Sequence, residues 1–268
     1  MKRLFTFGCS YTSWSWPTWA DMLVYEYKQR GLEGYNFGRC GAGNQYIFIK
    51  LLEADRKYKF TEEDTVIVEW TSMQREDRFA VGRWHTPGSI YSQNIYTSEF
   101  IDKWADPAHY VFRDCALISS VRKMLTLSKV NYVDFTMSTF KYLDSSNYNL
   151  QFEDVNEVLE FYGESIETTL PSMLEYLNLH KRSEEDRNRR LLSYWPGNKE
   201  TLGREWHPTP VEHFKYLSEV LLPHLQETLT ESTLGFIEHW DKSVTKLKQP
   251  INLEETGWVM NYSHSNPL

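Results

Sequence analysis

Three polar residues near opposite ends of the chain have the chemical types that a hydrolytic centre needs: Ser10, Glu205 and His207. Ser10 follows an apolar stretch in FTFGCSYTSW, and the other two stand in GREWHPTPVEH. A serine becomes a nucleophile when a base takes its proton, a third group orients that base, and N–H donors stabilise the oxyanion. We therefore predict that Ser10 is the nucleophile, that His207 is its general base, and that Glu205 orients the imidazole.

Donors for the oxyanion are expected in the glycine-rich turn GRCGAGN. We predict that the backbone N–H groups of Ser10 and Gly41 hold the oxyanion together with the side-chain amide of Asn44. The small residues around Gly41 allow a carbonyl oxygen to approach the backbone closely. The turn has neither the lysine of a P-loop nor the spacing of a dinucleotide-binding turn, so phosphate binding is not the favoured interpretation.

Alternating strands and helices must position these residues. Apolar runs predict strands at residues 3–8, from about 34, at 64–72 and at 130–138. Helical spacing predicts helices at residues 16–31, from about 44, at 115–128, at 152–179 with a break at Pro171, and a last one at 207–229. This order predicts a three-layer α/β/α sandwich with a mainly parallel sheet.

Ligands of parallel sheets gather at the carboxyl ends of the strands. Ser10, the turn from Gly41 to Asn44, and Thr71 with Ser72 all follow predicted strands directly. We therefore expect these three loops to meet at one edge of the sheet.

An aromatic-rich insertion is predicted at residues 73–114, within a domain that spans residues 1–229. We interpret the insertion as a specificity lid with Trp84 as a stacking platform. Thr71, Ser72 and Arg75 are further candidates for substrate contacts, although Arg75-Glu76-Asp77-Arg78 also has the composition of a solvated charge cluster. Residues 230–268 are expected to form an extension that packs on the domain or trails from it.

The order of these blocks resembles the SGNH (GDSL-type) hydrolases. Gly8-Cys9-Ser10 stands for the Gly-Asp-Ser turn, NFGRCGAGN for the glycine block, and EWHP for the late Asp-x-His-Pro form of the histidine motif. The spacing from Asn36 in that glycine block places the family's oxyanion glycine at Gly41. The resemblance covers roughly residues 4–78 and 201–225, and it implies an SGNH/flavodoxin-like fold and an esterase or deacetylase that acts on small or carbohydrate esters through an acyl-enzyme.

The chain departs from the family pattern in the third block. TSMQRED follows the strand VIVEW, and it has no asparagine where the family has one. Asn44, Thr71 or Ser72 could replace that group, or the oxyanion hole could be incomplete. Two alternatives to the hydrolase therefore stay open: an acyltransferase that uses the same site, and a non-catalytic binding or structural descendant.

Cysteine and histidine spacings give no sign of a metal or a cofactor. Cys9, Cys40 and Cys115 form no C-x-x-C pair, and His207 and His213 are six residues apart, so we predict neither a metal site nor a disulfide framework. His213 resembles a second histidine that is often present in the family's final helix, and we assign it no catalytic role. Side chains are expected to alternate along FTFGCS, so only one of Cys9 and Ser10 is expected to face the site.

Composition narrows the possible partners. The net charge is −8 with only short basic clusters, which disfavours nucleic acid as a ligand. We expect a small-molecule or glycan ester as the substrate and no membrane association, because no apolar run approaches the roughly 20 residues that a membrane span needs. An odd number of cysteines without disulfide spacing favours the cytoplasm, although export without a leader stays open, and the sequence leaves the oligomeric state undetermined.

Overall fold

The chain forms a central sheet of four parallel strands. The computed structural model describes residues 2–14, 16–91, 96–140, 152–179, 192–194, 202–204, 207–245 and 251–252. The strand order is β2-β1-β3-β6, with β1 at Arg3–Phe7, β2 at Glu33–Asn36, β3 at Thr65–Trp70 and β6 at Asn131–Thr136. The predicted strands are therefore confirmed, and β1 pairs in parallel with both β2 and β3.

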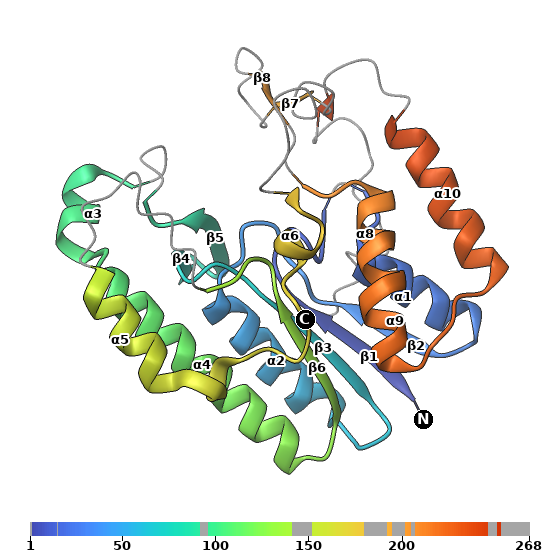
Figure 1. Cartoon of the computed structure of the whole chain (residues 1–268), viewed down its shortest axis with the longest axis horizontal. Coiled ribbons are helices and arrows are strands. Elements are labelled where there is room, and N and C mark those ends of the chain that lie inside the picture. Colours follow the sequence, from blue (N-terminus) through green and yellow to red (C-terminus); the bar gives the residue numbers. More distant parts are fainter. Residues whose placement is uncertain are drawn as a thin grey trace.

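Side chains of β1 alternate between two cores, one on each face of the sheet. Leu4 packs on one face, and Phe5 and Phe7 pack on the other. The Leu4 side is covered by α1 (Trp19–Gln29), α8 (Pro210–Tyr216), α9 (Leu222–Leu225) and α10 (Glu231–Thr245), and the Phe5 side by α2 (Asn44–Tyr58), α4 (Pro107–Leu127) and α5 (Phe152–Tyr162) (Figure 1). Buried parallel strands with helices on both faces make the predicted α/β/α sandwich.

Local sequence signals account for the ends of α1. Thr18 and Asp21 form a capping box at its first turn, where a side-chain oxygen satisfies backbone N–H groups that have no helical partner. The helix ends before Gly31, whose φ of +72° lies in the left-handed region that glycine adopts without strain.

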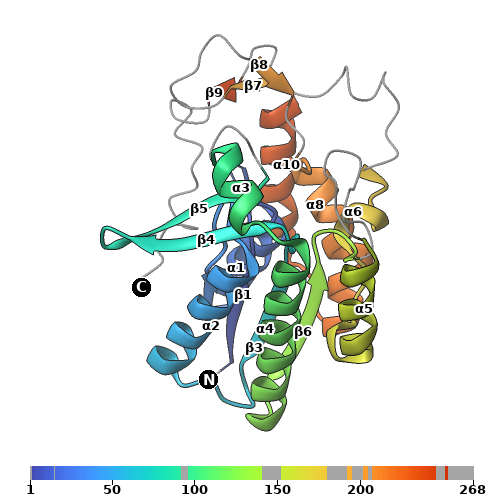
Figure 2. The same ribbon diagram turned by 90° about the vertical axis from the view of Figure 1, so that its left-hand side faces the viewer.

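The region of the predicted insertion has regular structure of its own. A hairpin of β4 (Arg75–Ala80) and β5 (Arg83–Ser89) follows β3 and projects from the domain, and α3 (Ser98–Trp104) comes next (Figure 2). Helix α4 already begins at Pro107, so the irregular stretch ends earlier than the predicted residue 114. Asp106 caps this helix through Ala108 N–H, and a capping aspartate before proline is a start signal that the sequence carries.

The prediction of a last helix at residues 207–229 is wrong in one respect, because α10 follows it. Helices α8 and α9 are joined by a π-helical turn, η3 (Leu217–Leu221), and α10 then packs against α1. The Glu26 carboxylate of α1 accepts hydrogen bonds from Thr230 N–H at 2.9 Å and from the Thr233 hydroxyl at 2.5 Å.

Shorter elements complete the described chain. A 3-10 turn, η1 (Gly163–Ile166), and α6 (Met173–Tyr176) follow α5. A separate small sheet pairs β7 (Leu192–Tyr194) with β8 (Leu202–Arg204) and β9 (Ile251–Asn252).

Candidate active site

The turn that carries Ser10 follows β1 directly. Thr12 N–H and Ser13 N–H donate to the Cys9 carbonyl at 3.0 and 3.1 Å, which closes the chain tightly around Ser10. Ser10 is 4% exposed, and its side chain makes no hydrogen bond within the described part of the chain. A serine hydroxyl with no internal partner at the carboxyl end of a parallel strand is placed where ligands of such sheets bind.

Thr12 anchors this turn from below. Its hydroxyl donates to Glu69 of β3, and its carbonyl accepts from the Thr18 hydroxyl at 2.6 Å and from Asn36 Nδ2 at 2.8 Å. The packing leaves no room beside it, since a Cβ on Gly8 would lie 2.0 Å from Thr12 Oγ1. The glycine before Cys9 is therefore required by close approach, and the Ser10 turn is held rigidly by its neighbours.

Two buried carboxyl groups belong to the hydrogen-bond network around Thr12. Burial raises the pKa of Glu69 to about 7, although the Thr12 hydroxyl and the Arg75 charge act in the opposite direction. Burial also raises the pKa of Asp21 to about 6, against the hydrogen bonds that it accepts from Thr18 and Asn36. The carboxyl groups of Glu69 and Asp21, which support the Ser10 turn, therefore titrate close to neutral pH.

Cys9 is turned into the interior. Its side chain is fully buried, its Sγ lies 3.8 Å from Met137 Sδ at the end of β6, and burial raises the pKa of the thiol. A buried thiol with a raised pKa is a poor nucleophile. All three cysteines are free, and Cys40 is exposed.

The structure brings His207 against the segment that carries Ser10. The imidazole stacks on the Trp14 indole with ring centroids 3.5 Å apart and an interplanar angle of 17°, and the Tyr11 ring lies 5.4 Å away. Trp16 Nε1–H donates to the Pro208 carbonyl at 2.8 Å and ties the histidine loop to the same segment. Residues 192 positions apart in the chain are thus neighbours. Glu205 lies outside the described residues, and its orienting role stays a prediction.

His213 lies beneath this histidine and is fully buried. Burial, and secondarily the neighbouring His207, lowers its pKa to about 3, so the ring is neutral at ordinary pH. Neither ring nitrogen has a hydrogen-bond partner within the described residues, and the Tyr11 ring lies edge-on 6.4 Å away.

Gly41 is required by packing as well as by its conformation. Its φ is +74°, and a Cβ here would lie 2.0 Å from the carbonyl oxygen of Thr86 in β5. The carbonyl that approaches this glycine closely is therefore one from the hairpin. The role of the Gly41 N–H as an oxyanion donor stays a prediction.

The prediction that the Asn44 side chain supplies an oxyanion donor is wrong. Its Nδ2 donates to the Thr71 carbonyl at 3.0 Å and to Asp114 Oδ2 at 2.8 Å, and its Oδ1 accepts from Thr71 N–H at 2.8 Å. The residue is fully buried. Because both side-chain amide hydrogens are engaged, Asn44 ties the start of α2 to the end of β3 and its side chain has no donor left for a substrate.

The remaining candidates lie at the same edge of the sheet. The Thr71 hydroxyl points to Met137 Sδ at 3.8 Å, and Ser72 Oγ accepts from Gln74 N–H at 3.3 Å. The Trp84 ring is partly exposed and makes edge-to-face contacts with Tyr46 and Phe79, both at 5.5 Å. Arg75 donates from Nη1 to the Ala42 carbonyl at 2.9 Å. Substrate contacts by these four residues stay predictions.

Sequence reasoning missed the structural role of Asp77. The interpretation as a solvated charge is wrong for this residue, which is 3% exposed and accepts from Gly43 N–H and Tyr46 N–H, both at 2.8 Å. It caps the first turn of α2, whose own N-cap Gly43 has no side chain to do so. Glu69 was also missed, although a single acid within the apolar run VIVEW is an unusual residue that could have drawn notice.

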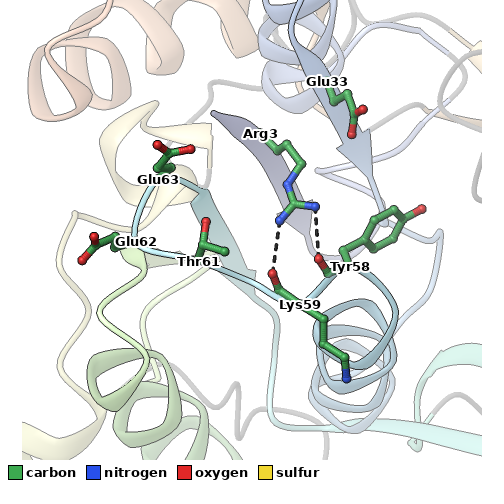
Figure 3. A pocket seen from close by; sticks show the side chains of 7 residues that line it. All are labelled: Arg3, Glu33, Tyr58, Lys59, Thr61, Glu62 and Glu63. Carbon is green, nitrogen blue, oxygen red and sulfur yellow. Dashed lines mark hydrogen bonds between the residues drawn. The ribbon is translucent and has the colours of Figure 1, made fainter. Parts of the chain in front are cut away.

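A cavity of about 550 Å³ lies at the opposite, amino end of the sheet. Figure 3 shows Arg3 of β1 at its centre, with the guanidinium donating to the carbonyls of Tyr58 and Lys59. The same guanidinium pairs with Asp64 at 2.7 Å. These bonds close the end of α2 and pair the basic group with a carboxylate, so we assign this cavity no part in the chemistry.

Comparisons with solved structures find similar folds at low identity. The chain is similar to the acetylxylan esterase Axe2 from Geobacillus stearothermophilus, with 13% identity, a TM-score of 0.42 and coverage of 86% of this chain and 96% of that chain. It is similar to a lipolytic G-D-S-L family member from Veillonella parvula, with 14% identity, a TM-score of 0.36 and coverage of 82% and 98%. It is also similar to the acetyl xylan esterase AlAXEase, with 16% identity, a TM-score of 0.31 and coverage of 61% of this chain and 71% of that chain.

No protein-family model matches the chain, and no curated protein matches it. Within the described ranges, no helix has the length and apolarity to cross a membrane, and no three His, Cys, Asp or Glu side chains are grouped to hold a metal ion.

Proposed function

We propose that this protein is a serine hydrolase of SGNH type that cleaves small or carbohydrate esters through an acyl-enzyme at Ser10. The observation that carries the proposal is the packing of His207 on Tyr11 and Trp14, which stand one and four residues after Ser10. These contacts bring the loop that carries His207 against the segment that carries Ser10, although the two are distant in the chain. The blocks that resemble SGNH hydrolases support the same assignment.

In the proposed mechanism, His207 takes the Ser10 proton as Ser10 Oγ attacks the ester carbonyl carbon. The carbonyl π electrons move to oxygen, and the backbone N–H groups of Ser10 and Gly41 receive that charge. The intermediate then expels the alcohol, which takes the proton from His207, and an acyl-enzyme remains. A water molecule then loses a proton to His207 and attacks the acyl carbon, the bond from this carbon to Ser10 Oγ breaks, and Oγ takes the proton back from His207 as the acid leaves. Glu205 orients the imidazole throughout.

Substrate selection is assigned to the rim of the site. Thr71 and Ser72 lie at the end of β3, and Trp84 stands on the hairpin beside the glycine turn. A partly exposed indole is suited to stacking on the apolar face of a sugar ring, which supports a carbohydrate ester as the substrate.

Intact-protein mass spectrometry after treatment with a fluorophosphonate tests the nucleophile. We expect a single adduct on the wild-type protein and none on the Ser10→Ala variant. The Cys9→Ala variant is the matched control, because it changes the adjacent buried side chain and should retain the adduct. Absence of an adduct on folded wild-type protein would refute the proposal. Release of acetate from p-nitrophenyl acetate and from acetylated xylo-oligosaccharides then compares simple with carbohydrate esters.

A further inference from the structure

We propose that Arg75 supplies the positive charge and the N–H donors that stabilise the oxyanion at Ser10. This inference rests on the proposed function. It names the side chain that donates to the oxyanion in place of the missing third-block asparagine. Asn44 is engaged by Thr71 and Asp114, and no asparagine follows β3 before Arg75. The side-chain donor that completes the oxyanion hole must therefore be of another type.

The position of the Arg75 guanidinium fits this role. Nη1 donates to the carbonyl of Ala42, the residue after Gly41, at 2.9 Å. Nη2 lies 3.6 Å from Met137 Sδ, and the same sulfur lies 3.8 Å from Cys9 Sγ. The guanidinium thus contacts the glycine turn directly, and Met137 alone separates it from Cys9, the residue that precedes Ser10.

The bonding of Arg75 differs from that of other part-buried arginines. Three of them contact an aspartate at 2.6–2.9 Å, in the pairs Arg3–Asp64, Arg113–Asp114 and Arg122–Asp134. Arg75 contacts no carboxylate within the described residues, and its hydrogen bonds there go to one carbonyl and one sulfur. A guanidinium has five N–H groups, so donors remain for an anionic oxygen.

The acids that surround Arg75 are engaged elsewhere. Asp77 accepts from the backbone of α2, and Glu69 accepts from Thr12. Burial raises the pKa of both carboxyls and of the Cys9 thiol, and the Arg75 charge offsets part of that rise. Its field therefore reaches the residue that is bonded to Ser10 without being cancelled by a contact ion pair.

A fixed positive charge at this point acts on the tetrahedral intermediate. Attack by Ser10 Oγ forms one C–O bond and converts the neutral carbonyl oxygen to an anion, and collapse returns that electron pair to the C=O bond. Arg75 gives up no proton, because a guanidinium stays protonated in proteins. Its contribution is greater in the transition state than in the ground state, so it raises kcat more than it changes KM.

Steady-state kinetics on p-nitrophenyl acetate, an uncharged ester, tests this proposal. We expect Arg75→Gln to lower kcat on the order of 100-fold with little change in KM, since a single oxyanion donor is worth about that much. Arg78→Gln is the matched control: this side chain is 53% exposed and pairs with Glu76 on the same strand. It should retain wild-type kcat. Added guanidinium ion should restore part of the activity of Arg75→Ala, which a purely structural role would not allow.

The outcomes separate this proposal from the hydrolase proposal. Absence of a fluorophosphonate adduct on folded wild-type protein would refute the hydrolase proposal. An adduct that depends on Ser10, together with an Arg75→Gln kcat within about threefold of wild type, would overturn only the role of Arg75. A rise in KM confined to esters that carry a carboxylate would also overturn it, because Arg75 would then bind the substrate's anionic group. If Arg75→Gln does not fold, Arg75→Lys and the guanidinium rescue decide.

Discussion

Substitution of Glu69 by glutamine should remove a pH dependence of stability that this carboxyl imposes. Burial raises its pKa from 4.5 to about 7 in the folded protein. The folded state therefore binds the proton more tightly than the unfolded state. This favourable contribution is complete below the unfolded pKa and is lost as pH rises through the folded one.

The magnitude follows from the difference between these two pKa values. A pKa of about 7 in the folded state against 4.5 in the unfolded state corresponds to about 3 kcal/mol in the free energy of unfolding. Glutamine keeps an oxygen that can accept a hydrogen bond from the Thr12 hydroxyl, but its side-chain amide does not titrate. The stability of wild type relative to Glu69→Gln should therefore fall by about 2–3 kcal/mol between about pH 5 and pH 8.

Urea denaturation of both proteins across this pH range measures that difference directly. The comparison isolates Glu69, because Asp21 and Asp114, whose pKa values burial raises to about 6, are present in both proteins. Thr12→Ser is a useful control, since it keeps the hydroxyl donor. Parallel pH profiles for wild type and Glu69→Gln would refute the reasoning.

Three further changes test other parts of the site. Asn44→Ala should destabilise the protein by at least about 3 kcal/mol in urea denaturation, because Asp114 and the Thr71 backbone lose buried partners; a loss of kcat with unchanged stability would contradict this. Trp14→Leu should lower kcat/KM for p-nitrophenyl acetate about tenfold or more by releasing the stacked His207 ring, and an unchanged value would place the base elsewhere. Burial lowers the pKa of His213 from 6.5 to about 3, so this residue contributes stability that is complete above pH 6.5 and is lost as the pH falls. The loss amounts to about 2 kcal/mol near pH 5, and His213→Leu should remove it. Equal acid sensitivity of this variant and wild type in urea denaturation would argue against it.

The sheet and its edge could be predicted because buried parallel strands are nearly continuous apolar runs. RLFTFG and VIVEW are short apolar runs of this kind, and the residues that follow them fall at the carboxyl edge by topology alone. The meeting of His207 with the Ser10 segment followed from the order of blocks that resemble a known family. That the contact is made through Trp14 was not predictable, because many aromatic residues in this chain serve only to pack.

The structural roles of individual polar residues could not be predicted, because their hydrogen-bond partners are distant in sequence. Asn44 stands at the start of a helix in a turn that would suit an oxyanion hole, and only the position of Asp114 shows that its amide is engaged. Asp77 is one of four consecutive charged residues, and its burial depends on α2 beginning beside it. Short-range patterns contain neither fact.

The base and the tip of the β4–β5 hairpin should differ in how far they tolerate changes of sequence. Its base is built into the domain, since Asp77 caps α2 and the Thr86 carbonyl closes on Gly41. Its tip is free, with Val81 97% exposed and Gly82 in open space. A variant without the hairpin should lose the framework of the site, whereas residues inserted at the tip should be accepted. The tip is thus a place for a fluorescent label that reports binding at the rim without disturbing the residues proposed to carry the chemistry.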